Sequence, residues 1–204
     1  DLKEPNMADD IETLCKKMVD DANAQLEKYE KEQVKKGVKK PDSMRTFLSK
    51  YEKSKSRTGE EQAEEVLAGR SWTCNSSHMA DAARHVGPKL NGKNLTSMSA
   101  LKKAVSQEDY DCFVEIYGKA MKKQGLRNYK GGTDFLPSSA DPLHLELADS
   151  RLPDKDPKVE ACRTAYAKAT REDGKPRNED YEKADKKWLE AYDKAHPQPA
   201  AGGK

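Results

Sequence analysis

The most constraining feature of this sequence is the spacing of apolar residues over residues 8–36. They recur at steps of three and four, and many of the positions between them are charged, mainly Lys and Glu. Because an α-helix turns once every 3.6 residues, this spacing places the apolar side chains on one stripe. The sequence therefore predicts a long amphipathic helix whose buried stripe consists of Ile11, Leu14, Met18, Ala22, Leu26 and Tyr29.

Similar spacings, with start and stop signals, predict further helices. The clearest begins after Ser106, which forms a capping box with Asp109, and ends at Gly125, a residue suited to the C′ position. Pro157 suits the first turn of another helix, and Asn178 suits the cap of the last one. The remaining helices are expected at residues 44–55, 60–68, 77–86 and 98–105. We therefore predict an all-α fold, an irregular bundle of about six to eight helices that ends in a helical hairpin.

Composition limits the core that this chain can bury. Of its 204 residues, 34% are hydrophobic and 36% are charged, against roughly 45–50% and 25% in a typical globular domain. β-branched and aromatic residues are too scarce for a thick sheet sandwich, and no window approaches the ~18 apolar residues that a membrane-spanning helix needs. We expect a thin core that includes Leu14, Met18, Leu101, Phe113, Tyr117, Tyr166 and Trp188.

Residues 126–156 interrupt the helical pattern with glycine and proline. The only regular spacing in this stretch is at Leu143, Leu145 and Leu147, which alternate with polar residues, as in a short extended piece or one helical turn. We predict a helical bundle over 1–125, an extended connector over 126–156, a C-terminal helical hairpin over 157–196 and a tail over 197–204. The connector carries many apolar residues for a loop, so we expect it to lie in a groove, on a neighbouring subunit in preference to its own helices. Its expected anchors are Phe135, Leu136, Leu143, Leu145, Leu147 and Leu152.

The four cysteines, Cys15, Cys74, Cys112 and Cys162, leave two redox states open. Three of them lie on or beside apolar stripes, where reduced thiols are commonly buried. Two disulfides would equally suit a thin-cored secreted protein. Four cysteines allow three pairings, and their spacing does not choose among them.

Two glycosylation sequons, at Asn75 and Asn94, are close to the number that chance produces in this composition. The chain begins with Asp1 rather than Met. We expect a processed mature chain of an organelle, such as the mitochondrion, or of the secretory pathway, in preference to a cytosolic protein.

No residue pattern indicates catalysis, a cofactor or a metal site. His78 and His85 are seven residues apart on one expected helix, about 10 Å along its axis. That separation is too large for two ligands near 2 Å from one ion. Cys74 lies in no nucleophile signature, and Gly131–Gly132 lacks the lysine and helix start of a phosphate loop. We therefore predict a protein that is not an enzyme and holds no cofactor or metal.

The sharpest local feature is a basic segment over residues 35–57, with a net charge of +7 against +2 for the whole chain. Such a segment can contact an acidic protein surface or nucleic-acid phosphates. Phe47 and Tyr51 fit an inward stripe, which disfavours base stacking. The expected contacts are Lys35, Lys36, Lys39, Lys40, Arg45, Lys50, Lys53, Lys55 and Arg57.

These features favour a non-catalytic structural or accessory subunit that binds other protein subunits within a larger assembly. The alternative is a secreted or surface helical binding protein stabilised by two disulfides. A weaker alternative is a nucleic-acid-binding protein that uses the basic segment.

Overall fold

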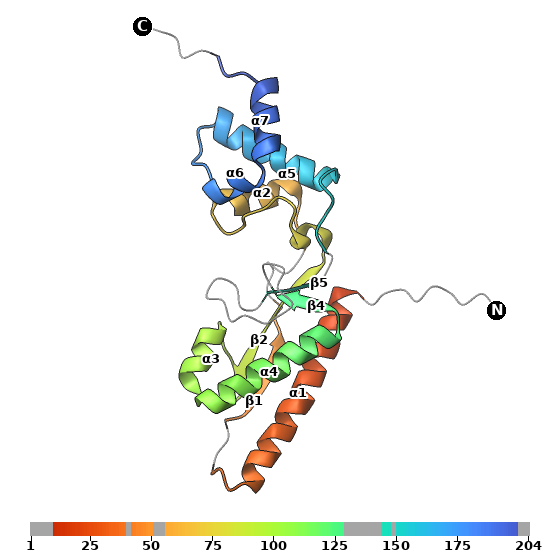
Figure 1. Ribbon diagram of the computed structural model, residues 1–204, viewed down its shortest axis with the longest axis vertical. Coiled ribbons are helices and arrows are strands. Elements are labelled where there is room, and N and C mark those ends of the chain that lie inside the picture. Colours follow the sequence, from red (N-terminus) through yellow and green to blue (C-terminus); the bar gives the residue numbers. More distant parts are fainter. Residues whose placement is uncertain (1–9, 40–41, 51–55, 129–143, 148–149, 200–204) are drawn as a thin grey trace, which may run out of the picture. The chain divides into compact units, whose positions relative to one another are not determined.

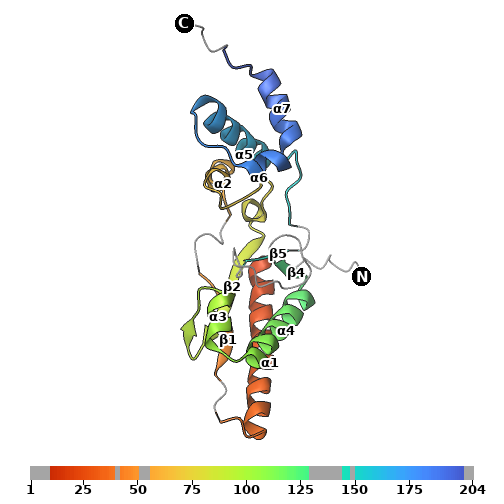
Figure 2. The same cartoon turned by 60° about the vertical axis from the view of Figure 1, so that its left-hand side comes forward.

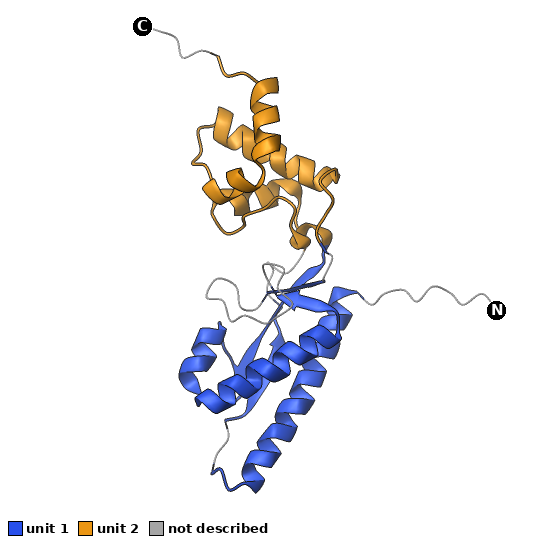
Figure 3. Cartoon of the chain, viewed as in Figure 1, with its two compact units in different colours: residues 1–55, 81–150 blue, residues 56–80, 151–204 orange. Residues whose placement is uncertain are grey.

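The computed structural model describes residues 10–39, 42–50, 56–128, 144–147 and 150–199. The chain divides into two compact units, coloured separately in Figure 3. Unit 1 comprises residues 1–55 and 81–150, and unit 2 comprises residues 56–80 and 151–204. This division differs from the predicted ranges because the helix expected at 60–68 packs with the C-terminal helices rather than with the N-terminal bundle.

In its described residues, unit 1 contains three helices and an antiparallel sheet, so the prediction of an all-α bundle is wrong. Its elements in chain order are α1 (Ile11–Lys35), β1 (Met44–Leu48), β2 (Ala83–Leu90), β3 (Lys93–Asn94), α3 (Met98–Ala104), α4 (Gln107–Lys123), β4 (Leu126–Asn128) and β5 (His144–Leu147). In the sheet, β1, β2, β5 and β4 lie in that order, and β3 pairs with β2.

The helices of unit 1 begin and end where local signals predict. Asp10 caps α1 by accepting a hydrogen bond from the Thr13 backbone N–H at 2.7 Å. Ser106 caps α4 through the Asp109 backbone N–H at 3.1 Å. Gly125 follows α4 with a φ of +68°, the left-handed conformation that glycine adopts most readily. These boundaries are local properties of the sequence.

Two expected helices, 44–55 and 77–86, are wrong over much of their length, because β1 and the start of β2 occupy them. Met44 pairs with Leu90 and Leu48 with Val86 in an antiparallel ladder. β1 is also tied to α1, since the Thr46 backbone N–H donates to Oδ1 of Asn23 at 2.7 Å. The apolar residues of these short segments have a spacing compatible with one or two helical turns, but pairing with distant strands determines the secondary structure that they adopt.

The core of unit 1 lies between the sheet and the pair α1 and α4, which lie side by side in Figures 1 and 2. The rings of Phe113 and Tyr117 stack with centroids 5.8 Å apart, and both side chains are buried as predicted. Leu14 lies at the edge of this core. Other buried members are Met18, Leu26, Met44, Val86, Met98, Leu101 and Leu145.

Unit 2 is helical and joins two segments that are far apart in sequence. Its elements are α2 (Gly59–Leu67), the 3₁₀ turn η2 (Ser77–Ala80), α5 (Pro157–Ala167), the π-helical turn η4 (Lys168–Glu172), α6 (Glu179–Ala184) and α7 (Lys186–Ala195). α2 packs on α5, and a disulfide between Cys74 and Cys162 links residues 88 positions apart. Tyr166 and Tyr181 pack nearby with ring centroids 4.3 Å apart.

Candidate functional site

The basic segment does not form one helical surface. Lys35, Lys36 and Lys39 are exposed at the end of α1. β1 then runs back along α1, because Arg45 contacts Glu30 whereas Thr46 contacts Asn23.

The other described basic residues of the segment have different surroundings. Lys50 is exposed beyond the far end of β1. Arg45 forms an ion pair with Glu30 at 2.7 Å. Arg57 belongs to unit 2, where its guanidinium donates to Oε1 of Gln62 at 3.1 Å. Lys40, Lys53 and Lys55 lie outside the described residues.

The described leucines of the expected connector lie in the two cores. Leu145 is fully buried in the core of unit 1, and Leu147 packs at its edge. Both belong to β5, so the alternation of these leucines does mark an extended piece. Leu152 packs against the core of unit 2. Phe135, Leu136 and Leu143 lie outside the described residues.

The cysteines fall into two pairs of different chemistry. Cys74 and Cys162 form a disulfide, whereas Cys15 and Cys112 are free thiols. Burial raises the pKa of Cys15 to about 12, so its thiol is neutral inside the core. Of the two sequon asparagines, Asn94 is exposed in β3 and Asn75 is half-buried.

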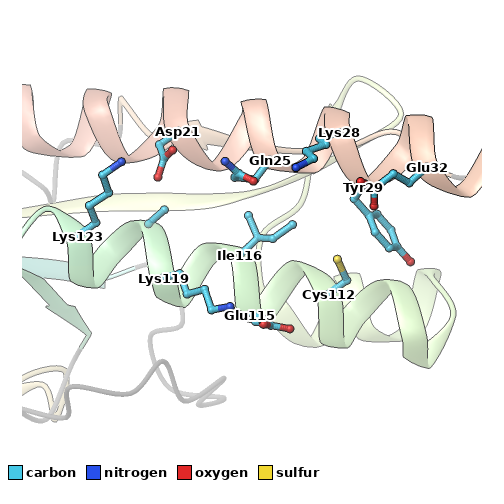
Figure 4. A pocket seen from close by; sticks show the side chains of 11 residues that line it. Asp21, Gln25, Lys28, Tyr29, Glu32, Cys112, Glu115, Ile116, Lys119 and Lys123 are labelled. Carbon is cyan, nitrogen blue, oxygen red and sulfur yellow. Dashed lines mark hydrogen bonds and ion pairs between the residues drawn. The ribbon is translucent and has the colours of Figure 1, made fainter.

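An open groove lies between α1 and α4 in unit 1. It has a volume of about 430 Å³, and side chains of both helices face each other across it (Figure 4). We call it the α1/α4 groove. It is lined by Asp21, Gln25, Lys28, Tyr29 and Glu32 of α1 and by Cys112, Glu115, Ile116, Lys119, Ala120 and Lys123 of α4.

Charges of both signs surround a small apolar floor in this groove. Ile116 and Ala120 lie on α4 between acidic and basic neighbours. Lys119 donates to Oε1 of Glu115 at 2.7 Å, and both side chains are mostly exposed. Exposed ion pairs of this kind contribute little to stability, so their charged groups can exchange partners at small cost.

Tyr29 forms a fixed wall at one end of the groove. Its hydroxyl donates to Oδ1 of Asp109 at 2.7 Å, which ties α1 to the first turn of α4. Burial, together with this hydrogen bond, raises the pKa of Tyr29 well above its usual value. Tyr29 is therefore a neutral and oriented aromatic side chain.

Cys112 lies at the same end of the groove, and its thiol is unreactive near neutral pH. Burial first, and then the negative charges of Glu115 and Asp109, raise its pKa to about 11. The nucleophile in cysteine chemistry is the thiolate, and a thiol with this pKa is almost wholly protonated near neutral pH. Cys112 thus contributes a small polarisable surface rather than a reactive group.

The sequence did not indicate this groove, because its members do not form a motif. The charged positions of α1 look like an ordinary solvated helix face. Only the packing of α1 against α4 brings Tyr29 and Ile116 to one surface. The i, i+4 relation of Glu115 and Lys119 was readable from the sequence, but it indicates a surface pair and no site.

Comparison with known proteins identifies no family. No family model, curated protein or solved structure matches the chain. In the described part of the chain, no helix is both long and apolar enough to cross a bilayer.

Proposed function

We propose that this chain is a non-catalytic binding protein that holds a segment of a partner protein in the α1/α4 groove. The observation that carries this proposal is the lining of the groove, in which charges of both signs flank an aliphatic floor. A peptide segment with one aliphatic side chain and charged neighbours of both signs is complementary to such a surface. Tyr29 adds a rigid aromatic wall, a residue type that is common at binding hot spots.

The charge pattern favours a protein partner over a nucleic acid. Asp21, Glu32 and Glu115 line the groove beside its lysines and would repel a phosphate backbone. The formal net charge of the chain, +2, adds little long-range attraction to a polyanion.

The disulfide supports an oxidising compartment for this binding protein. Disulfides form and persist in secreted, periplasmic or endoplasmic-reticulum proteins and are rare in the reducing cytosol. Cys74 and Cys162 close unit 2 across two segments that are 88 positions apart. A secreted or surface-exposed binding protein is therefore the form of the proposal that we favour.

Selection of binders from a random peptide library tests the groove directly. The full chain is immobilised, and the selected peptides are measured against it by fluorescence polarisation. We expect peptides with an aliphatic anchor and mixed charge. Lys119→Glu should weaken their binding by at least about fivefold, since rim charges typically contribute about 1 kcal/mol.

Lys103→Glu is the matched control, because it makes the same charge change on an exposed residue of α3 outside the groove. Binding to this variant should be unchanged, and heparin should not compete with the peptides. Equal losses in both variants, or displacement by heparin, would contradict the proposal.

A further inference from the structure

A second cluster, on the sheet of unit 1, consists of two histidines, a carboxylate and a guanidinium. The antiparallel register places His85 of β2 opposite His144 of β5, and Arg127 of β4 opposite Glu146 of β5. His144 and Glu146 are two residues apart, so they point to the same face of the sheet. Three strands thus bring four chemically active side chains together.

The carboxylate determines which nitrogen of His144 carries the proton. Arg127 Nε donates to Oε1 of Glu146 at 2.8 Å, so the guanidinium and the carboxylate form an ion pair. Its other oxygen, Oε2, lies 3.1 Å from Nε2 of His144. Because an ionised carboxylate only accepts hydrogen bonds, neutral His144 carries its proton on Nε2. Nδ1 of His144 then presents a lone pair.

The two imidazole rings are close to the geometry of a shared metal ion. Their ligating nitrogen atoms lie within 4.8 Å of each other. The ring centroids are 5.8 Å apart, with an interplanar angle of 72°. Two imidazoles bound to one tetrahedral ion at about 2.0–2.1 Å have centroids about 5 Å apart, so a small rotation of the side chains suffices.

The surroundings also suit a metal. The side chains of His144 and Glu146 are 3% and 5% exposed, so few waters compete. A carboxylate that accepts the second N–H of a metal-binding histidine fixes its tautomer and increases its basicity. The charge of Arg127 is balanced by Glu146.

We propose that His85 and His144 bind a divalent transition-metal ion of the zinc class through neutral imidazole nitrogens. Glu146 is a positioning residue that acts through His144, and Arg127 orients Glu146. The remaining coordination positions are left to water or to a donor atom of a bound molecule. Imidazole ligands suit Zn²⁺, Cu²⁺ and Ni²⁺ rather than Mg²⁺ or Ca²⁺. This site goes beyond the proposed binding function and does not depend on it.

Titration of the chelator-treated full chain with Zn²⁺ by isothermal calorimetry tests the site. We expect one saturable site, and a loss of at least about tenfold in affinity in both His85→Gln and His144→Gln, each of which removes one of two ligands. Glu146→Gln should weaken binding by about 10–100-fold, as is typical for carboxylates that support a ligating histidine. His196→Gln, which removes an exposed histidine of unit 2, is the control and should bind like the wild type.

A spectroscopic measurement on the wild type keeps the test decisive if a variant fails to fold. In ¹⁵N-labelled protein, Zn²⁺ should shift Nδ1 of His144 and leave its Nε2 protonated. Absence of saturable binding in the wild type would overturn the proposal. Unchanged affinity in both histidine variants would do so too, as would loss of the proton on Nε2 of His144 when Zn²⁺ is added.

Discussion

The Tyr29 hydroxyl of α1 donates a 2.7 Å hydrogen bond to Oδ1 of Asp109 in the first turn of α4, across 80 positions of sequence. Tyr29→Phe keeps the ring and removes the donor. We expect it to lower the free energy of unfolding by about 1–2 kcal/mol, since a hydrogen bond to a charged group contributes roughly 1.5–3 kcal/mol and less where it is partly exposed. Urea unfolding followed by circular dichroism measures the change. Tyr192→Phe, on half-buried Tyr192 of α7, should change stability by less than about 0.5 kcal/mol, and equal effects would contradict this role of Tyr29.

Gly59 allows α2 to approach α5 closely. A Cβ at this position would lie 2.6 Å from the carbonyl oxygen of Lys158 and 2.8 Å from the backbone nitrogen of Cys162. Backbone atoms cannot move aside as a flexible side chain can, so Gly59→Ala should destabilise unit 2 by about 1–3 kcal/mol. Trp72 and Trp188 both belong to unit 2, so tryptophan fluorescence during urea unfolding reports this change.

The control for Gly59→Ala is Glu60→Ala, an exposed neighbour in the same helix. It should change the free energy of unfolding by no more than about 0.5 kcal/mol. A Gly59→Ala variant as stable as this control would mean that α2 and α5 are not in close contact.

The disulfide predicts a specific thiol count. The denatured, unreduced chain should contain two titratable thiols, from Cys15 and Cys112, and the reduced chain four. Reduction, or the double change Cys74→Ala and Cys162→Ala, should lower the stability of unit 2 by about 2–5 kcal/mol. The midpoint of tryptophan fluorescence in urea measures this loss. Four thiols in the unreduced chain would contradict both the pairing and the proposed oxidising compartment.

The raised pKa of Cys112, about 11, predicts slow alkylation. Raising the pKa of an acid favours its neutral form, so the thiolate fraction at pH 7.5 is about 100-fold lower than for a thiol with an ordinary pKa of 9.0. Iodoacetamide should therefore modify native Cys112 at least about tenfold more slowly than the unfolded chain, and the rate should rise with pH towards 11. Mass spectrometry of the tryptic peptide measures it. Equal rates at pH 7.5 would show that the thiol is not shielded.

Helix ends were the part of the fold that local reasoning predicted best. Ser106 and Asn178 cap helices as predicted, because each side chain accepts a hydrogen bond from a backbone N–H three residues later. The first helix begins at Ile11, behind a cap at Asp10, rather than at residue 8. All these contacts lie within a few residues, so the sequence alone contains the information.

The sheet was missed because its evidence is not local. Met44–Leu48 is short and contains three apolar residues at helical spacing, and only pairing with Val86–Leu90 makes it a strand. His85 and His144 were not recognised as neighbours for the same reason: 59 positions separate them, and the β2–β5 register alone brings them opposite each other.

The sequence by itself determined the amphipathic helices of unit 1 and the cap of α4, because these depend on period and on near neighbours. It left Leu145 and Leu147 open between an extended piece and one helical turn, and pairing in the sheet made them a strand. Tertiary structure alone decided the sheet order, the Cys74–Cys162 pairing, and the α1/α4 groove. Each of these joins segments far apart in the chain. Spacing in sequence carries no information about which of several long-range contacts has the lowest free energy, since that depends on how all the buried surfaces fit at once.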